Sequence, residues 1–167
     1  MKPDRILGID PGLVATGVGI VSFDEHERPR ALFSGTIRPP RGETIAKRLY
    51  HLQIRIGEVI SEFQPDCVAV EEAFYHKNVK SALILGQARG AALAAAAAAD
   101  LDVMELSPKT VKQAAVGTGG AAKEQVAAMV VALLQLDQPP DSADACDALA
   151  VALAALHRRA LPAQIRS

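Results

Sequence analysis

Four acidic residues lie where carboxylates could hold a divalent metal. Asp10 and Glu71 each end a short apolar segment typical of a buried strand, and Asp144 and Asp147 lie three residues apart in an alanine-rich segment. At that spacing two side chains share one face of a helix, where like charges repel unless a cation lies between them. A carboxylate set without His or Cys suits Mg²⁺ or Mn²⁺ better than zinc. Two such ions could activate a water and stabilise the leaving oxygen of a phosphodiester.

Each of these acids also has an explanation without catalysis. Asp10 could initiate the turn formed by the Pro-Gly pair that follows it. Asp144 and Asp147 could be acids near the start of a helix, where they interact favourably with the helix dipole, although Asp147 lies deeper and has apolar neighbours. Glu71 could be a strand-edge charge, and because Glu72 follows it, the sequence leaves open which of the two points inward.

The apolar pattern predicts the elements that position these acids. Strands are expected at residues 5–10, 15–23, 31–37, 67–71 and 102–106, and helices at residues 43–63, 81–99, 108–116, 121–136 and 142–156. This order predicts an α/β fold in which a five-stranded mixed sheet is flanked by helices on both faces. Because ligand groups collect at the carboxyl ends of parallel strands, Asp10 and Glu71 should reach one crevice if their strands are adjacent and parallel.

Length and composition indicate one globular unit. The chain has 167 residues, of which 50% are hydrophobic and 22% charged, and this is ordinary composition for a globular domain. We therefore expect a single domain over residues 1–167, with a basic, loosely held tail at residues 158–167. Two cysteines, no apolar signal region and no apolar stretch long enough to cross a bilayer favour a cytoplasmic protein.

The local charge distribution is compatible with a polyanionic partner. The net charge of −1 by itself argues against one. Residues 28–55, however, contain seven basic residues and a single acid, Glu43. Such a segment can help to bind phosphates, provided that its charges share one face of the folded protein.

Five segments follow the order and spacing of one known family. They are residues 8–12, 69–78, 87–90, 112–117 and 143–150. With these motifs the chain resembles RuvC, the crossover junction endodeoxyribonuclease family, from about residue 5 to residue 156. The resemblance implies a ribonuclease H-like fold and an endonuclease of DNA recombination and repair. Such an enzyme binds Holliday junctions, which are four-way DNA junctions, as a homodimer and resolves them by paired, symmetric, metal-dependent nicks.

The resemblance also implies the chemical roles of the four acids. Asp10, Glu71, Asp144 and Asp147 match the catalytic acids of the family and would hold Mg²⁺, with Mn²⁺ as a substitute and two ions in each active site. The implied protein partner is the RuvA and RuvB branch-migration helicase complex.

DNA contacts follow from the same resemblance. Phe74 matches the aromatic that stacks on an unpaired base at the junction centre, and stacking of this kind tolerates any base sequence. By composition alone, Phe74 could equally be a core aromatic. Lys112 and Lys123 match basic residues near the scissile phosphate, where lysine serves as a point charge. Further DNA contacts are expected from Lys77, Lys80 and Arg89.

Other protein classes share parts of this pattern. The RuvX/YqgF group also begins with a strand and an Asp-Pro-Gly turn, but residues 74–78 and the pair Asp144 and Asp147 favour RuvC. Actin-like and sugar-kinase-like ATP-binding proteins need two such domains, and the chain is too short for a second copy. A junction-binding module without catalysis would bind phosphates more tightly if it lost the acids, so their presence argues against it.

Overall fold

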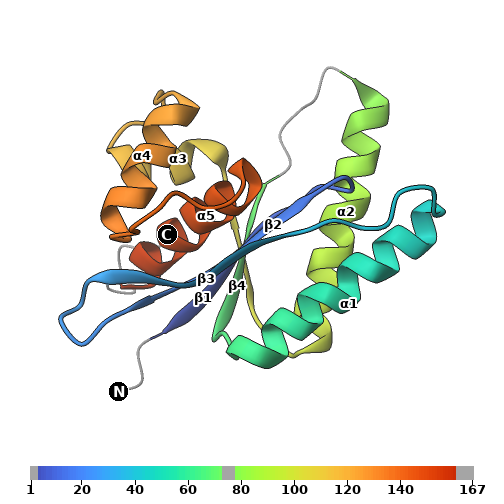
Figure 1. Ribbon diagram of the computed structural model, residues 1–167, viewed down its shortest axis with the longest axis horizontal. Coiled ribbons are helices and arrows are strands. Elements are labelled where there is room, and N and C mark those ends of the chain that lie inside the picture. Colours follow the sequence, from blue (N-terminus) through green and yellow to red (C-terminus); the bar gives the residue numbers. More distant parts are fainter. Residues whose placement is uncertain (1–3, 73–77, 161–167) are drawn as a thin grey trace.

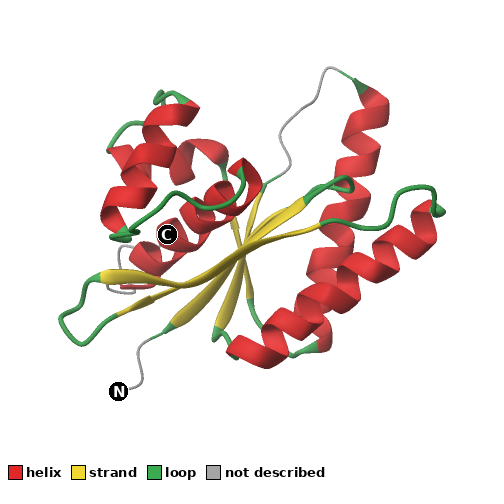
Figure 2. Ribbon diagram, in the orientation of Figure 1, coloured by secondary structure: helices red, strands yellow, loops and turns green. Residues whose placement is uncertain are grey.

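A five-stranded mixed sheet lies at the centre of the computed structural model, which describes residues 4–72 and 78–160 (Figures 1 and 2). Its strands are β1 (Arg5–Asp10), β2 (Thr16–Phe23), β3 (Pro29–Ile37), β4 (Cys67–Glu71) and β5 (Val103–Leu106). They follow the order β3-β2-β1-β4-β5, and β1 runs antiparallel to β2 and parallel to β4. The predicted fold class is confirmed, and β1 and β4 are adjacent and parallel, as the expected crevice requires.

Helices cover both faces of this sheet (Figure 1). On one face α1 and α2 pack on strand residues such as Leu7 and Val68, which are fully buried. On the other face α3, α4 and α5 pack on residues such as Ile6 and Ala69. The helices are α1 (Ile45–Phe63), α2 (Val79–Ala98), α3 (Pro108–Val116), α4 (Lys123–Leu133) and α5 (Ala143–Ala160). The alternation of apolar residues along β1 and β4 thus separates two cores, one on each side of the sheet.

α5 crosses β1 and β2 at a separation that requires glycine. A Cβ atom at Gly8 would lie 2.1 Å from the carbonyl oxygen of Ala148, and one at Gly17 would lie 1.8 Å from that of Asp144. The buried residues of α5 are largely alanines, which let the helix lie this close. Backbone therefore rests against backbone, and the height of α5 above the sheet is fixed by sterics.

The C-terminal end of α5 differs from the prediction. We expected a loosely held basic tail over residues 158–167, but α5 continues to Ala160. The guanidinium Nε of Arg159 donates to Asp4 Oδ2 at 2.9 Å, which ties the last turn to the residue before β1. The prediction is therefore wrong at the start of this segment, and residues 161–167 lie outside the described part of the chain.

α2 differs from the prediction, because the sequence predicted no apolar stretch long enough to cross a bilayer. By length and composition alone it is the one helix among the described residues that could cross a membrane, with 22% of the relevant window buried. Core helices of globular proteins pass the same test. Its buried alanines pack in the core of the sheet face it shares with α1. α2 is thus part of a helix layer, with an apolar side facing outward.

The variant Gly8→Ala tests the close packing of α5. Its added methyl would overlap the Ala148 carbonyl, and overpacking costs about 1–3 kcal/mol or more. We expect a clear fall in melting temperature and in the urea midpoint. Gly57→Ala in α1 is the matched control, because no atom lies within 4 Å of its added Cβ. That variant should gain about 0.5–1 kcal/mol, and equal effects of the two variants would contradict the packing described.

Candidate active site

The ends of β1 and β4 bring Asp10 and Glu71 together. Ile9 pairs with Val70 in the parallel register, so the acids that follow them are neighbours. Ile9 and Val70 belong to the core on the α1 and α2 side. Because side chains alternate along a strand, Asp10 and Glu71 point to the opposite side, towards α5. Glu72 is exposed, which answers the question that the sequence left open about this pair.

α5 supplies the two remaining acids. Ser142 caps the helix, since its hydroxyl accepts a hydrogen bond at 3.0 Å from the backbone N–H three residues later. Asp144 and Asp147 follow in the first turns and are half-buried. The carbonyl of Asp144 lies against Gly17, whose partner across the β1–β2 ladder is Asp10. The start of α5 therefore lies over the end of β1.

These elements form a pocket with a volume of about 360 Å³. Three acids and two lysines line it, together with apolar residues of α3, α4 and α5. The lining residues are Asp10, Glu71, Pro108, Val111, Lys112, Lys123, Val126, Asp147 and Ala150. Asp144 is close enough to raise the pKa of Asp10. The pocket thus combines a group of acids, two cations and an apolar wall.

The pocket holds more negative charge than its cations neutralise. The pKa of Asp10 is raised to about 7, first by burial and then by the carboxylates of Asp147, Glu71 and Asp144, while Lys123 lowers it. Burial and the Asp147 carboxylate also raise the pKa of Glu71. Carboxylic acids that resist joint ionisation in a cleft are typical of functional sites.

Lys123 provides the nearest counter-charge in the pocket. Its Nζ lies 2.6 Å from Asp147 Oδ2, although 67% of the lysine side chain is exposed. The hydrogen bond to Asp147 raises the pKa of Lys123. The ammonium group therefore occupies a position next to the acids where a positive charge is needed.

The donor set fits a hard divalent cation, because the site offers carboxylate oxygens whose charge Lys123 balances only in part. Over residues 4–72 and 78–160, no three His, Cys, Asp or Glu side chains are arranged so that they could hold a metal ion without moving. Asp147 is turned towards Lys123 instead. A cation that enters the pocket has to compete with Lys123 for this carboxylate.

The residues predicted to contact DNA lie at different places. Lys112 and Lys123 line the pocket beside the acids. Lys80 is exposed in the first turn of α2. Phe74 and Lys77 lie outside the described residues.

Two basic residues are engaged in ion pairs within the protein. Arg89 of α2, with 21% of its side chain exposed, pairs with Glu105 of β5. Arg55 of α1 pairs with Glu58 on the surface of the same helix. Arg89 therefore links α2 to the sheet, whatever further contact it makes.

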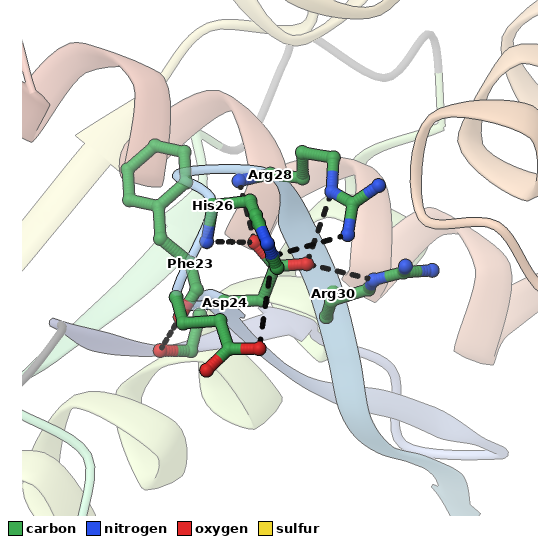
Figure 3. A network of polar contacts seen from close by, with 7 residues as sticks. Phe23, Asp24, His26, Arg28 and Arg30 are labelled. Carbon is green, nitrogen blue, oxygen red and sulfur yellow. Dashed lines mark hydrogen bonds and ion pairs between the residues drawn. The ribbon is translucent and has the colours of Figure 1, made fainter.

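A polar network at the β2–β3 turn engages part of the basic segment (Figure 3). The Asp24 carboxylate accepts hydrogen bonds from the backbone N–H of His26 at 2.8 Å and of Arg28 at 2.9 Å. It also pairs with the guanidinium groups of Arg28 at 3.2 Å and Arg30 at 3.4 Å. The backbone hydrogen bond from Arg28 is the main cause that lowers the pKa of Asp24 to about 2. These two arginines stabilise a turn, so their charge is not an independent cationic patch.

The sequence did not reveal the position of Arg48. Its Nη2 donates to the carbonyl oxygen of Leu13 at 2.7 Å, across 35 positions of sequence and into the loop after Asp10. From the sequence alone, Arg48 counted only as one of the basic residues within residues 28–55. No local pattern connects an α1 residue with this loop, because the contact arises from tertiary packing.

A family model for crossover junction endodeoxyribonuclease RuvC matches residues 6–155. The chain belongs to the RuvC family. RuvC of Halorhodospira halophila is 48% identical over 158 residues, which cover 95% of this chain and 93% of the relative. RuvC of Moorella thermoacetica is 49% identical over 148 residues, which cover 89% and 88%. The resemblance is confirmed, and the chain is an endodeoxyribonuclease of the crossover-junction class.

Solved RuvC structures have the same fold. The Thermus thermophilus RuvC structure has a TM-score of 0.84 and 37% identity, and the match covers 93% of this chain and 95% of that one. T. thermophilus RuvC in complex with a Holliday junction substrate has a TM-score of 0.82 and 35% identity over the same shares. The predicted ribonuclease H-like fold is confirmed.

The raised pKa of Asp10 predicts a pH-dependent stability in the metal-free protein. The folded state binds more protons than the unfolded chain between about pH 4 and about pH 7, so stability falls as the pH rises through this window. Asp10→Asn removes the ionising group and should raise the melting temperature in EDTA at pH 8, with little gain at pH 4. Asp137→Asn, which changes an exposed acid, should change nothing. A gain for Asp10→Asn that is equal at both pH values would contradict the assignment.

Proposed function

We propose that this RuvC protein binds four-way DNA junctions and resolves them by paired, divalent-metal-dependent hydrolysis of phosphodiester bonds. The observation that carries the proposal is the pocket in which acids from β1, β4 and α5 meet two lysines. Acids alone would repel DNA, whereas acids beside cations suit a metal-assisted reaction on a phosphate. The related T. thermophilus RuvC has been solved with a Holliday junction substrate, which supports the choice of DNA.

Asp10, Glu71, Asp144 and Asp147 would hold the metal in this proposal. We propose Mg²⁺ as the ion, with Mn²⁺ as a substitute and two ions in each site. When bound, such ions activate water and stabilise the charge that develops on the leaving oxygen. The chain contributes a partly buried carboxylate set whose mutual repulsion a cation relieves.

The lysines of the pocket would bind the scissile phosphate. Lys112 of α3 and Lys123 of α4 stand beside the acids, and an ammonium group serves as a point charge next to phosphate. Release of Lys123 from Asp147 would make its charge available to the substrate. Phe74, Lys77, Lys80 and Arg89 remain proposed DNA contacts, with Phe74 stacking on an unpaired base.

Two cuts across one junction require two active sites, so we propose a homodimer. Val79 and Leu83 of α2 are 73% and 65% exposed, and Tyr50 and Ile54 of α1 are 66% and 43% exposed. α1 and α2 lie against each other on the sheet face that does not carry the pocket. Exposed apolar surface of this kind marks contact sites, and symmetric dimers are the most frequent oligomers. The proposed dimer therefore uses the α1 and α2 layer and leaves the acids open to DNA.

The remaining parts of the proposal rest on family membership. We propose that the protein acts in the cytoplasm, as one domain, on junctions moved by the RuvA and RuvB helicase complex.

The adjacent acids Glu71 and Glu72 give a sharp test of the catalytic proposal. Glu71→Gln removes a carboxylate from the pocket, whereas Glu72→Gln changes an exposed side chain. We expect Glu71→Gln and Asp10→Asn to lose cleavage by about a thousandfold or more while they bind a synthetic four-way junction as tightly as before, or more tightly. Glu72→Gln should cut within about threefold of the unchanged protein. Strand-mapped nicks with Mg²⁺, Mn²⁺ or EDTA, on the junction and on a matched duplex, provide the measurement.

Three outcomes would count against this function. Cleavage in EDTA would contradict the metal dependence. Nicks on the duplex as frequent as on the junction would contradict the preference for junctions. An inactive Glu72→Gln beside an active Glu71→Gln would mean that Glu72, and not Glu71, is the ligand.

Leu83→Glu tests the dimer surface. A buried, unpaired carboxylate at an apolar interface is costly, so this variant should be a monomer at concentrations at which the unchanged protein sediments as a dimer. Leu32→Glu in β3, where the leucine is 48% exposed, is the control and should remain a dimer. A monomeric unchanged protein would contradict the proposed dimer, and loss of the dimer in Leu32→Glu alone would place the interface elsewhere.

A further inference from the structure

The loop that follows Asp10 is tied down by hydrogen bonds from two directions. Within the loop, the backbone N–H of Gly12 donates to Thr16 Oγ1 at 3.0 Å, and this hydroxyl donates to the Gly12 carbonyl at 2.7 Å. Thr16 is fully buried and Leu13 is 5% exposed. From outside, Arg48 Nη2 donates to the Leu13 carbonyl at 2.7 Å.

The contact of Arg48 differs from a surface ion pair. Arg48 is half-buried, and within the described residues its Nε is shielded from solvent and has no hydrogen-bond partner. A buried donor without a partner lowers the stability of the folded protein. An unpaired buried donor calls for an explanation, and a functional role of the group is one.

A direct phosphate contact fits Arg48 less well. Such a contact requires a guanidinium that faces solvent, whereas Nη2 points to the loop and Nε is shielded.

We infer that Arg48 is a positioning residue for the reaction: by holding the Leu13 carbonyl, it fixes the loop that sets the direction of the Asp10 carboxylate. The inference rests on the proposed role of Asp10 as a metal ligand. Asp10 is the last residue of β1, so its orientation depends on the path of the chain immediately after it. A displacement of about 1 Å between reacting groups can lower the rate by about a hundredfold.

The test separates the rate of cutting from binding. Arg48→Ala should lower the single-turnover cleavage rate at saturating junction by about tenfold to a hundredfold, with the junction Kd within about threefold of the unchanged protein. In the absence of DNA, its affinity for Mn²⁺, followed by electron paramagnetic resonance, should also fall. Arg48→Lys should recover part of both losses. The lysine ammonium group can approach the Leu13 carbonyl, but the lysine side chain is one atom shorter than that of arginine.

Arg55→Ala is the matched control. It removes the same charge from the same helix, but Arg55 pairs with Glu58 at the surface. Its cleavage rate at saturation and its Mn²⁺ affinity should be unchanged. If Arg48→Ala does not fold, Arg48→Lys and Arg48→Met, which keep the aliphatic stem, carry the test, with Arg48→Met expected to behave as a poor catalyst of normal junction affinity.

Several results would overturn the inference. A normal cleavage rate in a folded Arg48→Ala or Arg48→Met would do so, as would a loss confined to junction affinity, which would make Arg48 a DNA contact. Equal losses in Arg55→Ala would show that the effect of the Arg48 variants comes only from the loss of a positive charge on α1. If Asp10→Asn still cuts junctions, the proposed function fails; if Asp10→Asn is inactive and the Arg48 variants are normal, only this inference fails.

Discussion

The contact of α5 with the glycines of β1 and β2 determines where the four proposed metal ligands meet. Asp144 and Asp147 lie on α5, whereas Asp10 and Glu71 lie on strands, so no local pattern can set the spacing between the two pairs. That spacing is set where the Asp144 carbonyl meets the backbone at Gly17, opposite Asp10 in the ladder. Any side chain at that position would lift the helix and separate its acids from the sheet.

The second constraint is electrostatic and follows from the first. Close packing gathers acids in a partly buried pocket, and their repulsion together with burial raises the pKa of Asp10 to about 7. The apolar cores on both faces of the sheet supply the free energy that holds this arrangement together. Lys123 offsets only part of the repulsion, since most of its side chain is in solvent, where an ion pair is weak. The fold thus keeps a site that is poised to take up positive charge.

The sequence predicted those features that depend on local pattern. The ends of β1 and β4, the face shared by Asp144 and Asp147, and the mixed sheet all follow from apolar periodicity and from the placement of acids at strand ends. The sequence did not show which of Glu71 and Glu72 points inward. Alternation along a strand gives the direction of a side chain only relative to another residue whose direction is already known. Ile9 and Val70 provide that reference once the core is known.

Features that depend on tertiary contacts were not predictable. The tail prediction failed at Arg159, because its partner, Asp4, lies 155 positions away. The basic segment counted Arg28 and Arg30 as available cations, whereas Asp24 engages both in a turn. Charge counts along a sequence give the number of cations but not their partners.

The two faces of the sheet would carry different tasks in the proposed function, and Arg48 provides a contact between them near the acids. The pocket lies on the α5 side, and the proposed dimer surface lies on the α1 and α2 side. Arg48 belongs to α1, yet it holds the loop that leads out of Asp10. In the proposed dimer, α1 therefore has two roles: its exposed apolar residues belong to the proposed interface, and its Arg48 holds the loop after Asp10.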